Sequence, residues 1–284
     1  MDAAGPDDQL IFGYPEEWAD FRKRHPTFLE RFPHITATTR AAFARVMHES
    51  NDIERFVMLY GRLCVEDFHE IMLCCGNGYG FAALKLLRGL YEKAVTLEYL
   101  NDNPGELNSF YEHRHITDFK MLQSVKDVFG PHVLTPEFQT QVSTEYDRVK
   151  ERYMVTACRK CETKRVNFTW AKLDLAAMAK KTRVLGKLIQ SSYYYPMRHT
   201  HSTGAALIER LEHNDEGFGF NPDAQRPQAD DALREAHTII LEVLHIQQKR
   251  FTIEGFEPLY DRCVEDWKEI RGVDENGTRT TPNP

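Results

Sequence analysis

Residues 81–100 read FAALKLLRGLYEKAVTLEYL and carry the clearest helical pattern in the chain. Leucine and alanine recur in it at intervals of three and four, whereas Lys85, Arg88 and Glu92 fall on one narrow polar stripe at about 100° per residue. A glycine-containing break precedes the stretch, and the turn-forming run at 101–105 follows it. The pattern predicts an amphipathic helix over 81–100.

Helical periodicity also governs the rest of the chain, and the alternation typical of strands is nowhere sustained. Helices are expected to begin near Pro15 and to cover 38–49, 51–73, 106–129, 136–161, 172–178, 182–190, 196–212, 230–251 and 257–270. Residues 214–228 carry two glycines and two prolines and are expected to form a long surface loop. We therefore predict an all-α fold, a single bundle of about eight to eleven packed helices.

Three parts are expected along the chain. Residues 1–80 would form an N-terminal helical segment, and residues 81–255 a central helical bundle that holds the candidate site. Residues 256–284 would form a short C-terminal helix followed by a flexible tail, because chain ends rich in polar residues are seldom tied down.

The composition is that of a globular protein, with 42% hydrophobic and 28% charged residues in a chain of 284. No stretch approaches the roughly 20 apolar residues that a membrane span requires. Residues 1–9 are polar and lack the apolar centre of a signal peptide. The six cysteines are too sparse for a disulfide framework. The sequence predicts a cytoplasmic protein with no membrane partner.

The histidines and cysteines do not show the spacing of a metal site. Cys158 and Cys161 have the separation of a zinc-ligand pair, but no second pair lies nearby, and two ordinary thiols are the alternative. The histidines are scattered, without the HExxH pattern of a zinc-binding helix. We expect no metal and no cofactor.

The net charge of −7 is unevenly distributed. Between Lys150 and Lys187 there are eleven basic and three acidic residues, a local charge of +8 that leaves −15 for the remainder. Such a segment is typical of a surface that binds RNA or another polyanion. The alternative is a solvated face that acidic neighbours neutralise in the folded protein.

Arg88 and Glu92 are four residues apart and therefore share one face of the predicted helix, with Lys85 beside them. In a cleft between helices, the arginine could hold a phosphate and the carboxylate could orient the arginine. The alternative is a structural ion pair on a solvated stripe. On the first interpretation Arg88 and Glu92 are catalytic and Lys85 assists binding.

Residues 193–205 read YYYPMRHTHSTGA and contain the second group of candidates. A helix is expected to begin at Pro196, which would place Arg198 and His201 in its first turn, close to Tyr194. Free N–H groups at such a helix start bind phosphate, and histidine can act as a general base. Cleavage of RNA by its own 2′-hydroxyl needs only a base and a charge stabiliser.

These roles have a structural alternative, because a histidine in a helix is often a packed or capping residue. If some of the group form a site, Arg198 and His201 are the catalytic candidates. Tyr194 and His199 would then contribute to binding.

Several segments in order resemble the DUF5677 family of bacterial proteins of unknown function. The likeness covers roughly 81–206 and rests on the Arg-x-x-x-Glu helix at 86–92, the run at 97–104, the tryptophan segment at 170–179, and Tyr193 with His201 eight residues on. Where the family pattern leads us to expect a small polar residue between that tyrosine and histidine, this chain has Met197, and Pro196 also departs from the pattern. A role for a hydroxyl at that position is therefore not implied.

The layout also looks like that of HEPN domains, helical bundles that are often ribonucleases of defence and toxin systems. Their motif separates an arginine and a histidine more widely than Arg198 and His201, which have only two residues between them. The resemblance implies Arg88, Glu92, Arg198 and His201 as the catalytic set.

Two functions follow from these patterns. The first is metal-independent RNA cleavage or nucleic-acid binding, which requires Arg88 and Glu92 to lie beside His201 in the fold. The second is a non-catalytic helical interaction or regulatory module, forming a homodimer, with the aromatic residues of 251–267 suited to its interface.

Overall fold

The computed structural model describes residues 14, 16–157, 163–167, 169–201, 203–214 and 217–273. The predicted all-α fold of packed helices is confirmed, since helices dominate these ranges and their strands form only two short hairpins. The chain divides into two compact units, residues 1–101 with 178–284, and residues 102–177. The three-part division at residues 80 and 255 stays a prediction.

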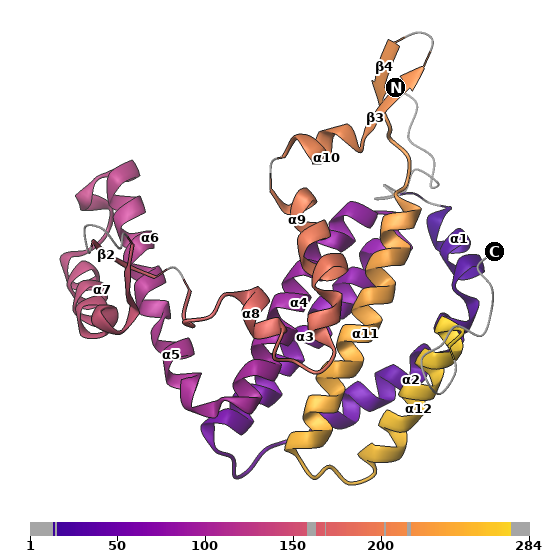
Figure 1. Cartoon of the computed structure of the whole chain (residues 1–284), viewed down its shortest axis with the longest axis horizontal. Helices are drawn as coiled ribbons and strands as arrows, with labels where there is room; N and C mark the ends of the chain where they lie inside the picture. The colour runs from indigo at the N-terminus through magenta and orange to yellow at the C-terminus, as the bar shows by residue number, and fades with distance from the viewer. Residues whose placement is uncertain are drawn as a thin grey trace, which may run out of the picture. The chain divides into compact units, whose positions relative to one another are not determined.

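The first unit contains most of the helices, with α8 lying across the boundary between the units. Its elements are α1 (Glu17–Arg24), α2 (Pro26–Phe43), α3 (Asp52–Gly76), α4 (Gly80–Asp102), α8 (Leu175–Ala179), α9 (Tyr195–Thr200), α10 (Gly204–Ile208), β3 (Leu211–Asn214), β4 (Gly217–Phe220), α11 (Arg226–Arg250) and α12 (Phe256–Arg271). Helix α11 packs along α3, and α12 packs along α2 (Figure 1).

Helix α4 provides the centre of the core. Leu84, Leu87, Leu90 and Leu97 are fully buried, as the period of three and four predicts. Helix α3 begins with a capping box, in which the side chains of Asn51 and Glu54 each accept a hydrogen bond from the other's backbone N–H at 3.0 Å. The lengths of these helices follow from such local signals.

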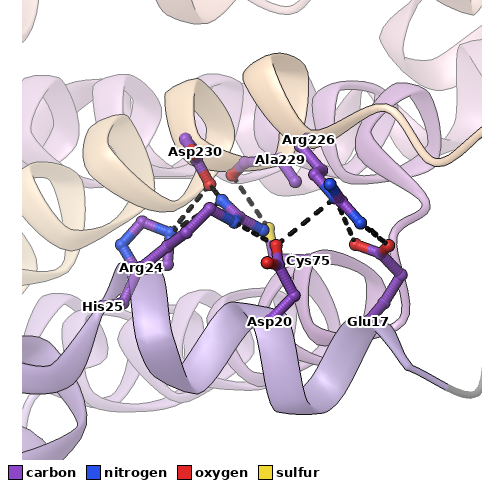
Figure 2. Close-up of polar contacts among 8 residues, drawn as sticks. All are labelled: Glu17, Asp20, Arg24, His25, Cys75, Arg226, Ala229 and Asp230. Atoms are coloured by element: carbon purple, nitrogen blue, oxygen red, sulfur yellow. Dashed lines mark hydrogen bonds and ion pairs between the residues drawn. The ribbon is translucent and has the colours of Figure 1, made fainter.

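A polar cluster joins α1 to the start of α11 (Figure 2). Arg226 binds the buried carboxylate of Glu17 through two nitrogens, the shorter contact being 2.6 Å. Arg24 bridges Asp20, at 2.7 Å, to Asp230 on α11. Charged groups lose hydration when they approach a core, and in this cluster each carboxylate has a guanidinium group beside it.

The second unit is a helical hairpin with a small sheet. Its elements are α5 (Leu107–Glu112), α6 (Arg114–Phe129), α7 (Pro136–Val149), β1 (Met154–Thr156) and β2 (Lys164–Val166). The strands pair in antiparallel register, with Val155 opposite Arg165. Ile116, Val149 and Tyr153 form the buried core of this unit.

Several predicted helix boundaries are wrong. The helix expected at 106–129 breaks at His113, and the helix expected at 136–161 ends at Val149 before strand β1. The helix expected at 196–212 is replaced by α9, α10 and strand β3, and the loop expected at 214–228 contains β4. Short hairpins escape periodicity because three or four residues give too few alternations to count.

The aromatic residues of 251–267 pack on their own chain. Phe256 is 1% exposed, and the indole N–H of Trp267 donates to Thr238 Oγ1 at 3.1 Å. Within the described ranges no helix is both long and apolar enough to span a membrane. Cys158, Cys161 and the tail beyond Val273 lie outside the described residues.

Two glycines of α4 allow a matched test of this packing. A methyl group at Gly80 would collide with the carbonyl oxygen of Gln225 and lie 2.7 Å from the amide nitrogen of Ala229, both backbone atoms that cannot move aside. At Gly89 the nearest heavy atom would be 3.8 Å away. We expect Gly80→Ala to lower the free energy of unfolding by about 2 kcal/mol, and Gly89→Ala to raise it by up to about 1 kcal/mol. Urea denaturation measures both, and equal effects would contradict the packing of α4 against the start of α11.

Candidate functional site

A continuous helical segment carries the second group of candidates. A 3-10 turn at Leu185–Leu188 leads into a π-helical turn at Gln190–Tyr194 and then into α9. Pro196 therefore lies inside a helical segment and does not start one. His201 follows the last residue of α9 in an extended conformation. The expected placement in a first turn with free N–H groups is wrong, because the helical path begins upstream of the proline.

Arg88 on α4 meets His201 across the unit. Arg88 Nη1 lies 3.0 Å from His201 Nε2, although the two residues are 113 positions apart. Arg88 Nε donates to Glu92 Oε1 at 2.9 Å. The side chain of Arg88 is 17% exposed and that of Glu92 is 42% exposed, whereas His201 is at the surface. The structure thus brings Arg88, Glu92 and His201 together.

The ring of Tyr193 contacts the guanidinium group of Arg88. The guanidinium carbon of Arg88 lies 4.9 Å from the centre of the Tyr193 ring, a cation–π geometry. Tyr193 in turn lies beside Tyr91, whose hydroxyl donates to the carbonyl oxygen of Leu185 at 2.8 Å. Burial raises the pKa of Tyr91 and keeps its hydroxyl protonated. Our sequence-based candidate set left out Tyr193, although its spacing from His201 was the available signal.

The π-helical turn explains why Tyr193 faces Arg88. A π turn inserts one extra residue per turn and so rotates the following side chains relative to an α-helix, a device frequent at functional sites. Tyr194, the next residue, is 38% exposed, and its ring packs edge-on against Tyr193 at 5.2 Å. An exposed aromatic ring therefore lies beside Tyr193, whose own ring contacts Arg88.

The contact between Arg88 and His201 fixes the role of the imidazole nitrogen. A guanidinium group can only donate hydrogen bonds, so Nε2 of His201 accepts and carries a lone pair. A neutral imidazole of this kind can take up a proton. Glu92 binds the Nε atom of Arg88, so the terminal nitrogens of the guanidinium group are not occupied by this carboxylate. The arrangement offers one base and one fixed cation at the surface.

Arg198 and His199 take part in a different cluster. Glu209 binds Arg198 Nη2 at 2.8 Å and lies 3.2 Å from Nε2 of the buried His199. The His199 ring stacks on Phe81 with 4.3 Å between centroids. Burial lowers the pKa of His199, while Glu209 opposes that shift. Among the described residues no contact joins Arg198 to Arg88, so the geometry of Arg198 and His199 is that of a brace between α9 and α10.

Lys85 is exposed on α4, and its charge acts on His199, whose pKa it helps to lower. The basic segment 150–187 is neutralised in part. Lys150 pairs with Asp147 at 2.7 Å, and Arg183 binds the buried carboxylate of Glu242 at 2.7 Å. Acidic residues outside the segment therefore offset part of its charge of +8 in the folded protein.

No group of three or more histidine, cysteine, aspartate or glutamate side chains arranged to hold a metal ion occurs in the described ranges. A family model described as a family of unknown function, DUF5677, matches residues 55–218. The matched range includes Arg88, Glu92, Tyr193 and His201. No curated protein and no solved structure matches the chain. These comparisons give no support to the similarity with HEPN domains.

The brace at Glu209 can be tested by stability. Glu209→Gln removes the charge that pairs with Arg198 and lies 3.2 Å from Nε2 of the buried His199, so we expect the free energy of unfolding to fall by about 1 kcal/mol. Glu212 is exposed and accepts a hydrogen bond from Asn221 that an amide oxygen can still accept. Glu212→Gln is the matched control and should change stability by less than about 0.5 kcal/mol. Denaturant unfolding compares the two variants. If Glu209→Gln leaves the free energy of unfolding unchanged, the structural role of this cluster is rejected.

Proposed function

The chain belongs to the DUF5677 family of unknown function, and we propose that it is a HEPN-like, metal-independent RNA-cleaving or RNA-binding protein of a bacterial defence or toxin type. The observation that carries the proposal is the 3.0 Å contact between Arg88 Nη1 and His201 Nε2. It joins the two residue types that RNA cleavage through the 2′-hydroxyl requires.

In the proposed reaction His201 is the general base. When RNA binds, a phosphate oxygen replaces His201 as the partner of Arg88 Nη1, which frees the lone pair of Nε2. Nε2 then takes the proton of the 2′-hydroxyl, and the freed oxygen attacks the adjacent phosphorus. Arg88 stabilises the negative charge that gathers on the phosphate oxygens. The bond to the 5′-oxygen then breaks, and that oxygen takes a proton from water or from the protonated histidine. The products are a 2′,3′-cyclic phosphate and a free 5′-hydroxyl.

The neighbouring residues have supporting roles in this proposal. Glu92 orients Arg88 through the 2.9 Å contact, and the Tyr193 ring fixes the plane of the guanidinium. The exposed ring of Tyr194 offers a face on which a base can stack. Lys85 adds a positive charge for the phosphate backbone. Arg198 and His199, expected from the sequence to act in catalysis and binding, hold the segment in place instead.

The test is incubation of the purified full chain with mixed RNA, with and without EDTA. We expect cleavage in both conditions, with products that end in a cyclic phosphate. His201→Ala and Arg88→Ala should each lower the rate by at least about 100-fold, the usual contribution of a general base or a charge stabiliser. His48→Ala, which alters an exposed histidine away from the site, should leave the rate unchanged.

Cleavage that persists in His201→Ala would sink the catalytic assignment. The absence of cleavage, together with an unchanged affinity for RNA in Arg88→Ala, would also remove the binding form of the proposal. A folded chain that neither cleaves nor binds RNA would leave the second candidate function below.

The second candidate is an interaction module, and one feature of residues 102–177 favours it. A hollow of about 520 Å³ lies between α6 and α7, with Met121, Val125, Leu134 and Phe138 among its lining residues. Met121 is 62% exposed and Phe138 is 48% exposed. A two-helix hairpin has too few layers to bury such a face alone. A second copy of the chain would complete a four-helix arrangement.

Sedimentation of the full chain tests the dimer. We expect association at micromolar concentration, abolished by the double change Met121→Lys and Phe138→Lys, because two charges would enter an apolar interface. Leu59 is 65% exposed on α3, and Leu59→Lys is the matched control that should leave association intact. A chain that is monomeric at every concentration tested rejects the dimer. These variants lie outside the Arg88 site, so their result is separate from that of the RNA assay.

A further inference from the structure

A second hollow lies in the unit formed by residues 1–101 and 178–284, away from the site described above. It has a volume of about 190 Å³, and its lining comes from α2, α11, α12 and the residue between α1 and α2. Phe28, Leu233 and Ile270 provide apolar surface, and His25, His237 and Arg271 provide polar groups. None of these residues lies in the range 55–218 that the family model matches.

The size of this hollow suits a small organic molecule. A cavity of about 150 Å³ with apolar walls is large enough to hold a benzene ring. Phe28 and Leu233 are 3% and 4% exposed, so the wall they form belongs to the core. A ring or a short branched chain with one polar substituent would fill the space.

His237 is a buried polar side chain in the lining of the hollow. The residue is 3% exposed, and within the described part of the chain its imidazole forms no hydrogen bond. Its ring packs edge-to-face with the Phe28 ring, with 5.3 Å between the centroids. Burial, and then the charge of Arg271, lowers the pKa of His237 to about 3, so the ring is neutral at physiological pH. A neutral imidazole can donate one hydrogen bond to a ligand in the hollow.

Arg271 contributes a guanidinium group to the lining of the hollow, whereas Arg234, which also lines it, is paired with Asp231. Arg271 donates to Thr238 Oγ1 at 2.7 Å and stacks on Trp267, which holds its guanidinium in a fixed position. The acidic lining residue, Asp230, is already bound by Arg24 and by His25 at 2.7 Å (Figure 2). Arg24 and His25 together satisfy that carboxylate.

We infer that this hollow binds a small carboxylate with an aromatic ring or a short branched chain, about the size of benzoate. The carboxylate lies between Arg271 and His237, where it accepts a charge-assisted hydrogen bond and a neutral one. The apolar part lies against Phe28, Leu233 and Ile270. The hollow is thus a ligand site separate from the Arg88 cluster.

The test is an NMR titration of the full chain with benzoate, with benzyl alcohol as the uncharged probe of similar shape. We expect benzoate to shift the ring signals of His237 with a Kd on the order of 1 mM, in keeping with a ligand of so few atoms. Benzyl alcohol should bind at least about 10-fold more weakly, because it lacks the charge that Arg271 contacts.

Four variants localise the binding. Arg271→Gln should weaken benzoate binding by at least about 10-fold, whereas Arg262→Gln, on an exposed part of α12, should not change it. Ile270→Trp should abolish binding by filling the hollow, and Ile270→Val should preserve it. Ile270 is only partly buried, so the larger ring can be accommodated without unfolding, which circular dichroism verifies.

The inference is overturned if benzoate shifts no signal of His237 at tens of millimolar, or if it binds folded Ile270→Trp as well as it binds the original chain. Equal affinity for benzoate and benzyl alcohol would overturn the carboxylate assignment. None of these outcomes depends on RNA cleavage, because the two sites share no residue.

Discussion

The second half of helix α4 lies entirely within the core. Every residue from Ala94 to Asn101 is buried, and three of them, Thr96, Glu98 and Asn101, are polar. A polar group in a core must find a partner or the fold loses several kcal/mol. Arg183 N–H donates to Glu98 Oε1 at 2.8 Å, and Arg250 Nε donates to Asn101 Oδ1 at 2.8 Å. Two distant parts of the chain are thereby tied to α4.

These ties also position the candidate site. The bond to Arg183 holds the chain just before the helical segment 185–200, and the guanidinium of Arg183 continues to Glu242 on α11. The segment therefore runs beside α4, where Tyr91 fastens it again at Leu185. At its far end His201 reaches the first half of α4, whose Arg88 lies on the less buried side. A surface contact thus rests on buried hydrogen bonds.

The sequence was sufficient for much of this, for stated physical reasons. The apolar stripe of α4 follows from periodicity, and the stripe of Lys85, Arg88 and Glu92 opposite it indicates an exposed face. The proximity of His201 to Arg88 was the condition set for the RNA hypothesis, and the structure meets it. The position of His201 at a helix end was missed, because Pro196 resembles a helix start and a π turn has no sequence signature. Glu209 was missed because its pairing with Arg198 and His199 leaves no trace in local spacing. Tyr193 was missed although its spacing from His201 was a visible signal.

The family match excludes helix α11, which is nevertheless part of the core. The matched range ends at residue 218, before α11, yet α11 is the helix that covers α3. Ala236, Ile239, Ile240 and Val243 of α11 are fully buried. The part of the chain by which relatives are recognised is therefore smaller than the part that folds. A relative that keeps α3 and α4 still has to cover them with an apolar helix. Close packing restricts the side-chain volumes of that helix more strictly than the identities of its residues. Sequence similarity between relatives can thus be lost at α11, although the fold still requires a helix at that position.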